Sequence, residues 1–242
     1  MQKKETDLRE ETTTSQRMMK MHADVMFTSD KQGRLLRINE PWPNTGPAAR
    51  FFLTRPSFGS ACGYYREDLS NELVQQLAEW VSREGNAEAL TQAPRFIGKY
   101  RRLLGETQME YGPCYWIPNL PVEKEAVFLS KENVGLVTRN DFFWLEKELP
   151  FVQSCAAVIR DGQAVSICRS VRVSEQAEEA GLETLERYRG RGYGGLTVAA
   201  WAQTVRQRGR IPLYSTSWDN TASQRVAQKL ALRWYGGNFA IW

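Results

Sequence analysis

A short run of glycine and arginine in the C-terminal half of the chain has the residue types and spacing of an anion-binding loop. Residues 188–195 read YRGRGYGG, and the apolar, helix-like segment 196–205 follows them directly. Glycines tolerate positive φ and let a ligand approach the backbone closely. The first N–H groups of a helix lack intrahelical partners and lie at the positive end of its dipole, where anions bind well. The loop therefore predicts a site for a phosphate or pyrophosphate.

Two other interpretations of these glycines have to be weighed. Gly190, Gly192 and Gly195 also have the spacing of a dinucleotide-binding turn, and Arg-Gly tracts can be disordered nucleic-acid contacts. A dinucleotide turn follows a buried apolar strand and opens a domain with several further strands. Here the charged segment 186–189 precedes the glycines and fewer than fifty residues follow them. A disordered tract would extend further, without an apolar helix behind it.

The elements that must position the loop follow a definite order. Two apolar or alternating runs, 154–160 and 163–170, flank Asp161-Gly162, a pair typical of two-residue hairpins. A third run, 178–185, reaches the loop, so the three predict an antiparallel meander. A helix is expected over 193–208.

The segment after that helix completes the pattern. Gly209 is expected to end the helix as its C-cap. Residues 211–217 predict a crossover strand parallel to the strand before the loop. Asn220 starts a short helix, and a last strand follows.

The spacing Arg189-x-x-Gly192-x-Gly194, in this order of elements, resembles the acyl-CoA signature of GNAT-type N-acetyltransferases. The resemblance covers roughly 121–242 and implies an α+β chain with the GNAT fold, a mostly antiparallel mixed sheet that splays at the cofactor site. It divides the chain into an N-terminal α+β extension, 1–120, on the acceptor side, and an acyl-CoA-binding domain, 121–242. The branch it resembles includes antibiotic self-resistance acetyltransferases.

The resemblance also implies which residues contact acetyl-CoA. Its pantetheine arm is expected between the strand that ends at Thr184 and the strand over 214–217, and Arg206, Arg208, Arg210 and Lys229 are candidates for its 3′-phosphate. The expected cofactor residues are Thr184, Leu185, Arg189, Gly190, Arg191, Gly192, Tyr193, Gly194, Gly195, Asn220 and Ser223.

For catalysis the chain offers carboxylates and one departure from the family. Glu178 and Glu183 precede the loop, and a carboxylate whose pKa is raised by burial can take a proton from an ammonium substrate. The alternative is that both only solvate an edge strand. The Tyr that protonates the leaving thiolate in family members is replaced by Ala227. Tyr235 is the expected substitute, with Tyr214, a water or no donor as alternatives.

Composition and charge restrict the class of partner. The formal net charge of +4 suits an anionic cofactor but does not indicate a nucleic-acid binder, which carries clustered basic stripes. No run approaches the roughly 20 apolar residues of a membrane span, and 1–17 has no signal-peptide core. We therefore expect a cytoplasmic protein without a membrane or nucleic-acid partner. An oligomer is compatible with the sequence.

The cysteines and the single histidine give no metal signature. The expected state of the four cysteines is reduced and mostly buried, with an acyl-cysteine route through Cys168 as the alternative. His22 is expected at the surface or at a strand edge. No metal is predicted. The four cysteines are Cys62, Cys114, Cys155 and Cys168.

The N-terminal half gives weaker signals. The first twenty residues are expected to be frayed. A hairpin is predicted from 25–28 and 35–38, a helix over 69–81 capped by Asp68, a second helix over 95–104 and a strand around 111–117. Four aromatic residues are expected in the core, with part of them walling the acceptor pocket: Phe51, Phe52, Tyr64 and Tyr65.

These features predict an N-acetyltransferase that moves an acetyl group from acetyl-CoA to a primary amine by direct attack in a ternary complex. A small-molecule acceptor is favoured over protein lysine. A non-catalytic acyl-CoA-binding or regulatory module with the same fold is the alternative, because the missing Tyr is compatible with it. A dinucleotide-dependent redox protein fits the order of elements poorly.

Overall fold

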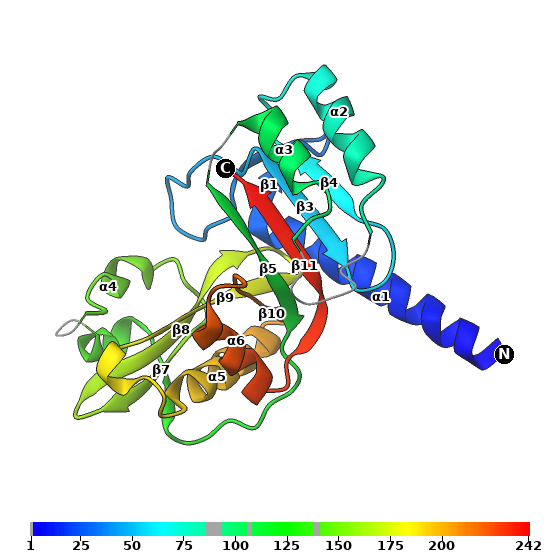
Figure 1. Ribbon diagram of the computed structural model, residues 1–242. Helices are drawn as coiled ribbons and strands as arrows, with labels where there is room; N and C mark the ends of the chain where they lie inside the picture. The colour runs from blue at the N-terminus through cyan, green and yellow to red at the C-terminus, as the bar shows by residue number, and fades with distance from the viewer. Residues whose placement is uncertain (1, 86–92, 106–107, 138–140) are drawn as a thin grey trace.

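The computed structural model describes residues 2–85, 93–105, 108–137 and 141–242, and one mixed β-sheet forms its centre (Figure 1). Within these residues nine strands pair in the order β4-β3-β11-β5-β10-β9-β8-β7-β6. The strands of this sheet are β3 (Phe51–Pro56), β4 (Cys62–Tyr65), β5 (Met109–Trp116), β6 (Ala126–Phe128), β7 (Cys155–Arg160), β8 (Gln163–Val173), β9 (Ala177–Thr184), β10 (Ile211–Ser215) and β11 (Arg233–Ile241).

Helices cover both faces of the sheet, and a small separate hairpin lies beside it. The hairpin consists of β1 (Phe27–Ser29) and β2 (Leu35–Ile38). In Figure 1 the N-terminal part of α1 extends away from the body of the molecule. The α-helices are α1 (Gln2–Met26), α2 (Asn71–Val81), α3 (Ile97–Leu104), α4 (Leu145–Glu148), α5 (Tyr193–Gln207) and α6 (Thr221–Lys229).

The predicted order of the C-terminal half is confirmed. Strands β7, β8 and β9 form an antiparallel meander. Asp161 and Gly162 both have positive φ, 51° and 72°, as a two-residue hairpin turn requires. Strand β10 runs parallel to β9, and α5 connects the two. The predicted mixed α+β fold class is therefore correct.

The sheet separates between β9 and β10. The two strands pair only from Ala177 and Ile211 to Glu179 and Leu213, although β9 continues to Thr184. On its other edge β10 stays paired with β5 as far as Ser215. The C-terminal ends of two neighbouring parallel strands are therefore free of each other, as the predicted splay requires.

The two faces beside this gap have different cores. Helices α5 and α6 bury Trp201, Val198 and Ala227 against one face, together with Tyr214 of β10. Helix α1 buries Met19 and other methionines against the opposite face, around residues of β5, β10 and β11. Because successive strand residues point to opposite faces, each strand that borders the gap contributes to both cores.

Several expectations for the N-terminal half were wrong. Residues 2–20 belong to α1; from Ser15 to Val25 the buried positions of this helix recur at helical spacing and pack on the sheet. Helix α2 is capped by Ser70, whose hydroxyl accepts from the Leu73 N–H at 3.2 Å. Asp68 pairs with Arg66 instead, at 2.8 Å. The hairpin, α3 and β5 lie close to their predicted positions.

Strand β3 was not predicted, because all six of its residues are buried. A strand covered on both faces loses the alternation of polar and apolar residues that identifies a half-buried strand.

The sheet extends across the predicted domain boundary at residue 120. Strand β5, which precedes the boundary, lies between β10 and β11, which follow it. Strands β3 and β4 add to the same sheet beyond β11. The division into an extension and a core domain stays a prediction, but the two parts share one set of backbone hydrogen bonds.

Gly112 on β5 offers a test of the packing beside the gap. A Cβ on Gly112 would lie 1.7 Å from the Thr216 carbonyl oxygen, just beyond β10. We expect Gly112→Ala to lower the free energy of unfolding by about 3 kcal/mol, at the upper end of overpacking costs, because backbone must move. In Gly98→Ala the new Cβ meets no atom within 4 Å, and helix propensity should leave stability unchanged or raise it. Urea unfolding of both variants checks this; equal stabilities would contradict the close approach.

Candidate functional site

A large cleft opens where β9 and β10 separate. Its volume is about 1790 Å³, well above the roughly 300–1,000 Å³ of pockets for one small ligand. The ends of β9 and β10, most residues of 185–196 and one side of α6 line it, together with residues of β1, β3, β5 and β11. The cleft therefore has room for two reactants that meet in the gap.

The glycine loop places the start of α5 in the wall of this cleft. Gly190 and Gly192 have φ of 78° and 86°, a region that favours glycine. Gly192 is the N-cap of α5, and no side chain caps that end. At Gly194 a Cβ would lie 3.3 Å from the Leu182 side chain, so this glycine lets α5 pack tightly on β9. The uncapped first turn is suited to bind a phosphate.

A chain of hydroxyl groups fixes the end of β9 to α5. The Ser166 hydroxyl bonds to the Thr184 hydroxyl at 2.8 Å and accepts from Thr197 at 3.0 Å. Thr197 also bonds to the Tyr193 carbonyl oxygen at 2.7 Å. Arg189 Nε donates to the Thr184 carbonyl oxygen at 3.3 Å. A network of hydrogen bonds of this kind holds one wall of the cleft in a fixed position.

The structure brings almost all of the predicted cofactor residues together. The exception is Arg191, whose guanidinium stacks on the Tyr188 ring at 5.4 Å and does not line the cleft. The predicted residues that line the cleft are Thr184, Leu185, Arg189, Gly190, Gly192, Tyr193, Gly194, Gly195, Asn220 and Ser223. Sequence reasoning missed Leu182, Tyr188, Leu196 and Arg225, which line it as well.

Four basic residues were candidates for binding the 3′-phosphate. Among them, and within the described residues, only Lys229 lines the cleft. Arg206 donates to the Ile117 carbonyl oxygen, and Arg208 donates to Gln153 at 2.5 Å. Arg210 pairs with Glu178 at 2.8 Å. These three arginines thus fasten α5 and the loop after it to other elements.

The two predicted bases have different surroundings. Glu183 lines the cleft and pairs with Arg169 at 3.3 Å. Glu178 is buried on the α5 face, where it binds Arg210 and accepts from Ser170, whose hydroxyl also accepts from the Trp201 indole. Glu178 does not line the cleft. Its catalytic role stays a prediction, while its contacts are those of a buried structural ion pair.

The two candidate proton donors, Tyr235 and Tyr214, also have different surroundings. Tyr235 is buried on the α1 face, where its hydroxyl bonds to His22 Nδ1 at 3.2 Å, and it does not line the cleft. Tyr214 lines the cleft, and its hydroxyl bonds to the Ser223 hydroxyl at 2.6 Å. Burial raises the pKa of both phenols, so both keep their proton at neutral pH. Tyr214 therefore has the better position to donate a proton.

Ala227 is part of the core that α5 and α6 share, and only 2% of it is exposed. A Tyr at this position would overpack that core, so the proton donor that the sequence resemblance expects there would not fit without a movement of α6.

A buried polar cluster that sequence reasoning missed lies next to the gap. Glu179 is 3% exposed, and its Oε1 accepts from the N–H and the hydroxyl of Ser215 at 2.5 and 2.7 Å. Burial raises the pKa of this carboxyl to about 7. His22 lies 3.9 Å from the other carboxylate oxygen, and burial lowers its pKa to about 4, so its ring is neutral at pH 7.

The expectation that His22 lies at the surface was therefore wrong, because α1 carries it under the sheet. Its helical spacing with Met18, Met19 and Val25 was the signal that could have placed it in the core. Glu178 and Glu179 are consecutive on a strand and so face opposite sides. The sequence alone does not say which of these two glutamate side chains lies on the side of the sheet that α1 covers.

The cysteines are free, as expected; Cys62 is exposed and the other three are buried. Cys168 is fully buried, and burial raises the pKa of its thiol well above the ordinary value. It does not line the cleft, so an acyl-cysteine route through it has no geometric support. Within the described residues no three His, Cys, Asp or Glu side chains are grouped as a metal site, and no helix has the length and apolarity to cross a membrane.

Comparison with known proteins gives a family match to one segment of the chain. Residues 155–235, about a third of the chain, match the model of the GNAT acetyltransferase family. No curated protein gives a match to the chain.

A comparison with solved structures gives matches to acetyltransferases. One is a putative GNAT acetyltransferase from Novosphingobium aromaticivorans, with a TM-score of 0.44 and 17% identity over 55% of this chain and 63% of its own, less than two thirds of its length. An acetyltransferase from Colwellia psychrerythraea has a TM-score of 0.46 and 14% identity over 83% of this chain and 84% of its own. An aminoglycoside N-acetyltransferase in complex with CoA has a TM-score of 0.34 and 21% identity over 43% of this chain and 88% of its own.

The loop geometry gives a prediction for Gly192. A Val there must adopt a φ that costs about 1–2 kcal/mol, and its side chain would project at the start of α5. We expect Gly192→Val to weaken acetyl-CoA binding at least 10-fold in calorimetry. Gly33→Val is the matched control: Gly33 has φ of 80° in a turn away from the cleft, and neither glycine has atoms within 4 Å of a new Cβ. Equal affinities of the two variants would remove the loop from the binding site.

Glu179 gives a prediction for stability against pH. Its pKa is about 7 in the folded protein and 4.5 ordinarily, so between these values the folded state binds more protons than the unfolded state. The contribution of this group to stability therefore falls as pH rises from about 4.5 to 7. The Gln side chain of Glu179→Gln does not titrate. The difference in the free energy of unfolding, Glu179→Gln minus wild type, should therefore grow as pH rises from about 4.5 to 7 and stay constant above that range. Parallel curves in urea unfolding would contradict the buried titration.

Proposed function

We propose that this chain, which matches the GNAT acetyltransferase family over residues 155–235, transfers an acetyl group from acetyl-CoA to the primary amine of a small molecule. The observation that carries the proposal is the uncapped, glycine-rich start of α5 in the wall of a cleft, at the point where β9 and β10 separate. The transfer proceeds by direct attack in a ternary complex, because the volume of the cleft suits two reactants at once.

Acetyl-CoA occupies the side of the cleft formed by the loop, α5 and α6. Its pyrophosphate accepts hydrogen bonds from the first N–H groups of α5, and its pantetheine arm lies along the free end of β9 beside Thr184 and Leu185. Arg189, Arg225 and Lys229 are the basic side chains that line the cleft within the described residues, and all belong to the loop or to α6. Positive charge is thus placed where the phosphates bind.

The amine occupies the opposite side. Carboxylates of Glu110, Asp141 and Glu183, which lie outside the loop and α6, line the cleft, as do the apolar side chains of Phe52 and Trp242; the loop and α6 side also has Glu186 and Asp219. No Lys or Arg of the described residues lines the side opposite the loop and α6. A cationic amine is attracted to such a surface, and the phosphates of CoA are not. Phe52 was among the aromatics expected to wall the acceptor pocket.

Tyr214 is the group that protonates the leaving thiolate. Its hydroxyl is in the cleft at the gap and keeps its proton at neutral pH, whereas Tyr235 is covered by α1. CoA thiolate is a fairly good leaving group, so the acid contributes less than the factor of about 10² to 10⁴ of a strong general acid.

A non-catalytic acyl-CoA-binding module is the second candidate. The observation that favours it is Ala227, which stands where the family has its acidic Tyr and is buried in the core. In that case acetyl-CoA binds to the same loop, but no side chain protonates the leaving thiolate and the acetyl group is not transferred.

Binding and turnover separate these candidates. Calorimetry with acetyl-CoA and with NAD should show binding of acetyl-CoA only. Release of CoA thiol is then measured over a panel of small primary amines. Slow but measurable transfer to at least one amine is expected. Tight acetyl-CoA binding without thiol release over the whole panel would favour the binding module, and binding of NAD alone would overturn both.

Tyr214→Phe tests the proton donor. We expect it to lower kcat about 10-fold and to leave the affinity for acetyl-CoA within a few-fold of wild type, since the phenol acts on the leaving thiolate. Tyr235→Phe, the same change in a buried tyrosine outside the cleft, should leave kcat close to wild type. A larger loss in Tyr235→Phe than in Tyr214→Phe would assign the acid to Tyr235.

A further inference from the structure

The ammonium group of the acceptor must lose a proton before it can attack, and the gap between β9 and β10 contains a buried carboxylate that can take it. The last register pair of the two strands is Glu179 and Leu213. Two residues further along β10, Ser215 has no ladder partner on β9. Its N–H and hydroxyl both donate to Glu179 Oε1, at 2.5 and 2.7 Å. The Glu179 side chain thus occupies the place that the next backbone hydrogen bond of the ladder would have.

Ser215 connects this carboxylate to the cleft. Of the two residues, Ser215 lines the cleft and Glu179 does not. On its far edge Ser215 remains paired with Cys114 of β5, so the backbone of Ser215 is held on both sides. A substrate in the gap therefore reaches Glu179 through the Ser215 hydroxyl.

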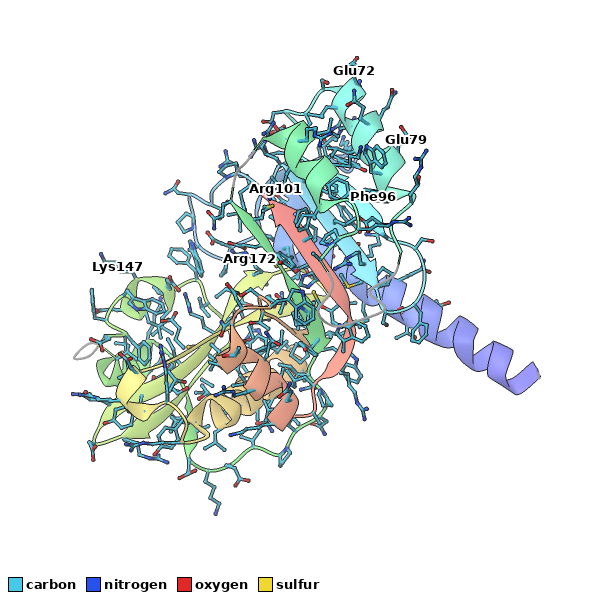
Figure 2. All side chains as sticks on the ribbon, viewed as in Figure 1. Glu72, Glu79, Phe96, Arg101, Lys147 and Arg172 are labelled. Carbon is cyan, nitrogen blue, oxygen red and sulfur yellow. The ribbon has the colours of Figure 1, made fainter. Side chains whose placement is uncertain are left out.

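The surroundings of Glu179 leave it free to accept a proton. Its Oε2 is buried and has no hydrogen-bond partner within the described residues. Arg172 of β8, labelled in Figure 2, is a positively charged group near Glu179, and it pairs with Glu40 at 3.1 Å. Other ionisable groups near Glu179 are neutral at pH 7: His22 of α1, Cys114 of β5, Cys168 of β8, Tyr214 of β10 and Tyr235 of β11.

The cluster behind Glu179 does not compete for the proton. His22 Nε2 lies 3.0 Å from Asn238 Nδ2, and Nδ1 lies 3.2 Å from the Tyr235 hydroxyl. Both ring nitrogens are thus engaged, and burial lowers the pKa of the ring to about 4. A proton that arrives at pH 7 therefore remains on the carboxyl.

We propose that Ser215 and Glu179 form the proton route of the acceptor amine, with Ser215 in contact with the amine and Glu179 as the group that stores the proton. This inference rests on the proposed function.

Protons and bonds change places in a fixed order along this route. One N–H proton of the ammonium passes to the Ser215 oxygen while the Ser215 hydroxyl proton passes to Glu179 Oε1. The neutral amine forms a bond to the thioester carbonyl carbon, and the carbon–sulfur bond breaks. The second proton of the nitrogen ends on the leaving thiol, and Glu179 later releases its proton to solvent.

The test is the pH dependence of kcat/KM with acetyl-CoA and the best alkylamine from the panel, compared with a fluorinated analogue of that amine whose amino group is neutral at pH 7. A base near pH 7 gives wild type an acidic limb there, because burial raises the pKa of Glu179 to about 7. Glu179→Gln should remove this limb and lower kcat/KM about 10²-fold or more with the alkylamine, but far less with the neutral analogue. Ser215→Ala should show the same pattern, and Ser215→Thr should restore activity because it keeps the hydroxyl.

Two controls separate the route from a loss of structure. Glu84→Gln changes another buried carboxyl, which binds Tyr100 at 3.0 Å away from the cleft, and should keep the wild-type pH profile. Equal losses with both amines in Glu179→Gln would show a structural role and overturn the route, as would an unchanged acidic limb in an active Glu179→Gln enzyme. If wild type binds acetyl-CoA but releases thiol with no amine, the proposed function itself fails and the route has no reaction to serve.

Discussion

The separation of β9 from β10 is the constraint on which the site depends. Parallel strands normally continue their ladder, and backbone groups left without partners inside a protein are costly. Here the ladder stops at Glu179 and Leu213. One of the groups that it leaves open, the Ser215 N–H, is bonded by the Glu179 side chain, and the ends of both strands line the cleft. A sheet that separates in this way provides backbone donors and acceptors to a ligand while it stays rigid on both sides.

Rigidity comes from helices that belong to different parts of the chain. Helix α5 is fixed to the end of β9 by the hydroxyl groups of Thr184, Ser166 and Thr197. Helix α1 covers the opposite face and contributes His22 to the cluster beside Glu179. The N-terminal half is thus more than an addition to the proposed acyl-CoA site: it covers the Glu179 carboxyl and supplies three strands to the same sheet.

The sequence predicted the parts of this arrangement that depend on local signals. The Asp161-Gly162 turn, the glycine loop and the Asn220 cap each require particular backbone angles or capping groups, and these residues supply them. The sequence did not predict which residues far apart in the chain pack against each other. Glu178 and Glu179 differ only in the face to which they point, and that is decided by α1, whose helical character at His22 was missed. Strand β3 was missed because burial on both faces removed its alternation.

The central claim is that acetyl-CoA binds in the gap between β9 and β10, with its phosphates at the start of α5. Amide hydrogen exchange with and without acetyl-CoA tests it most directly, because the free ends of these elements exchange with solvent until a ligand bonds to them. The account predicts that acetyl-CoA slows exchange in segments 182–196 and 214–230 and leaves β4 and α2 unchanged. Protection confined to other segments, or none in 182–196 when the protein is saturated with acetyl-CoA, would contradict it.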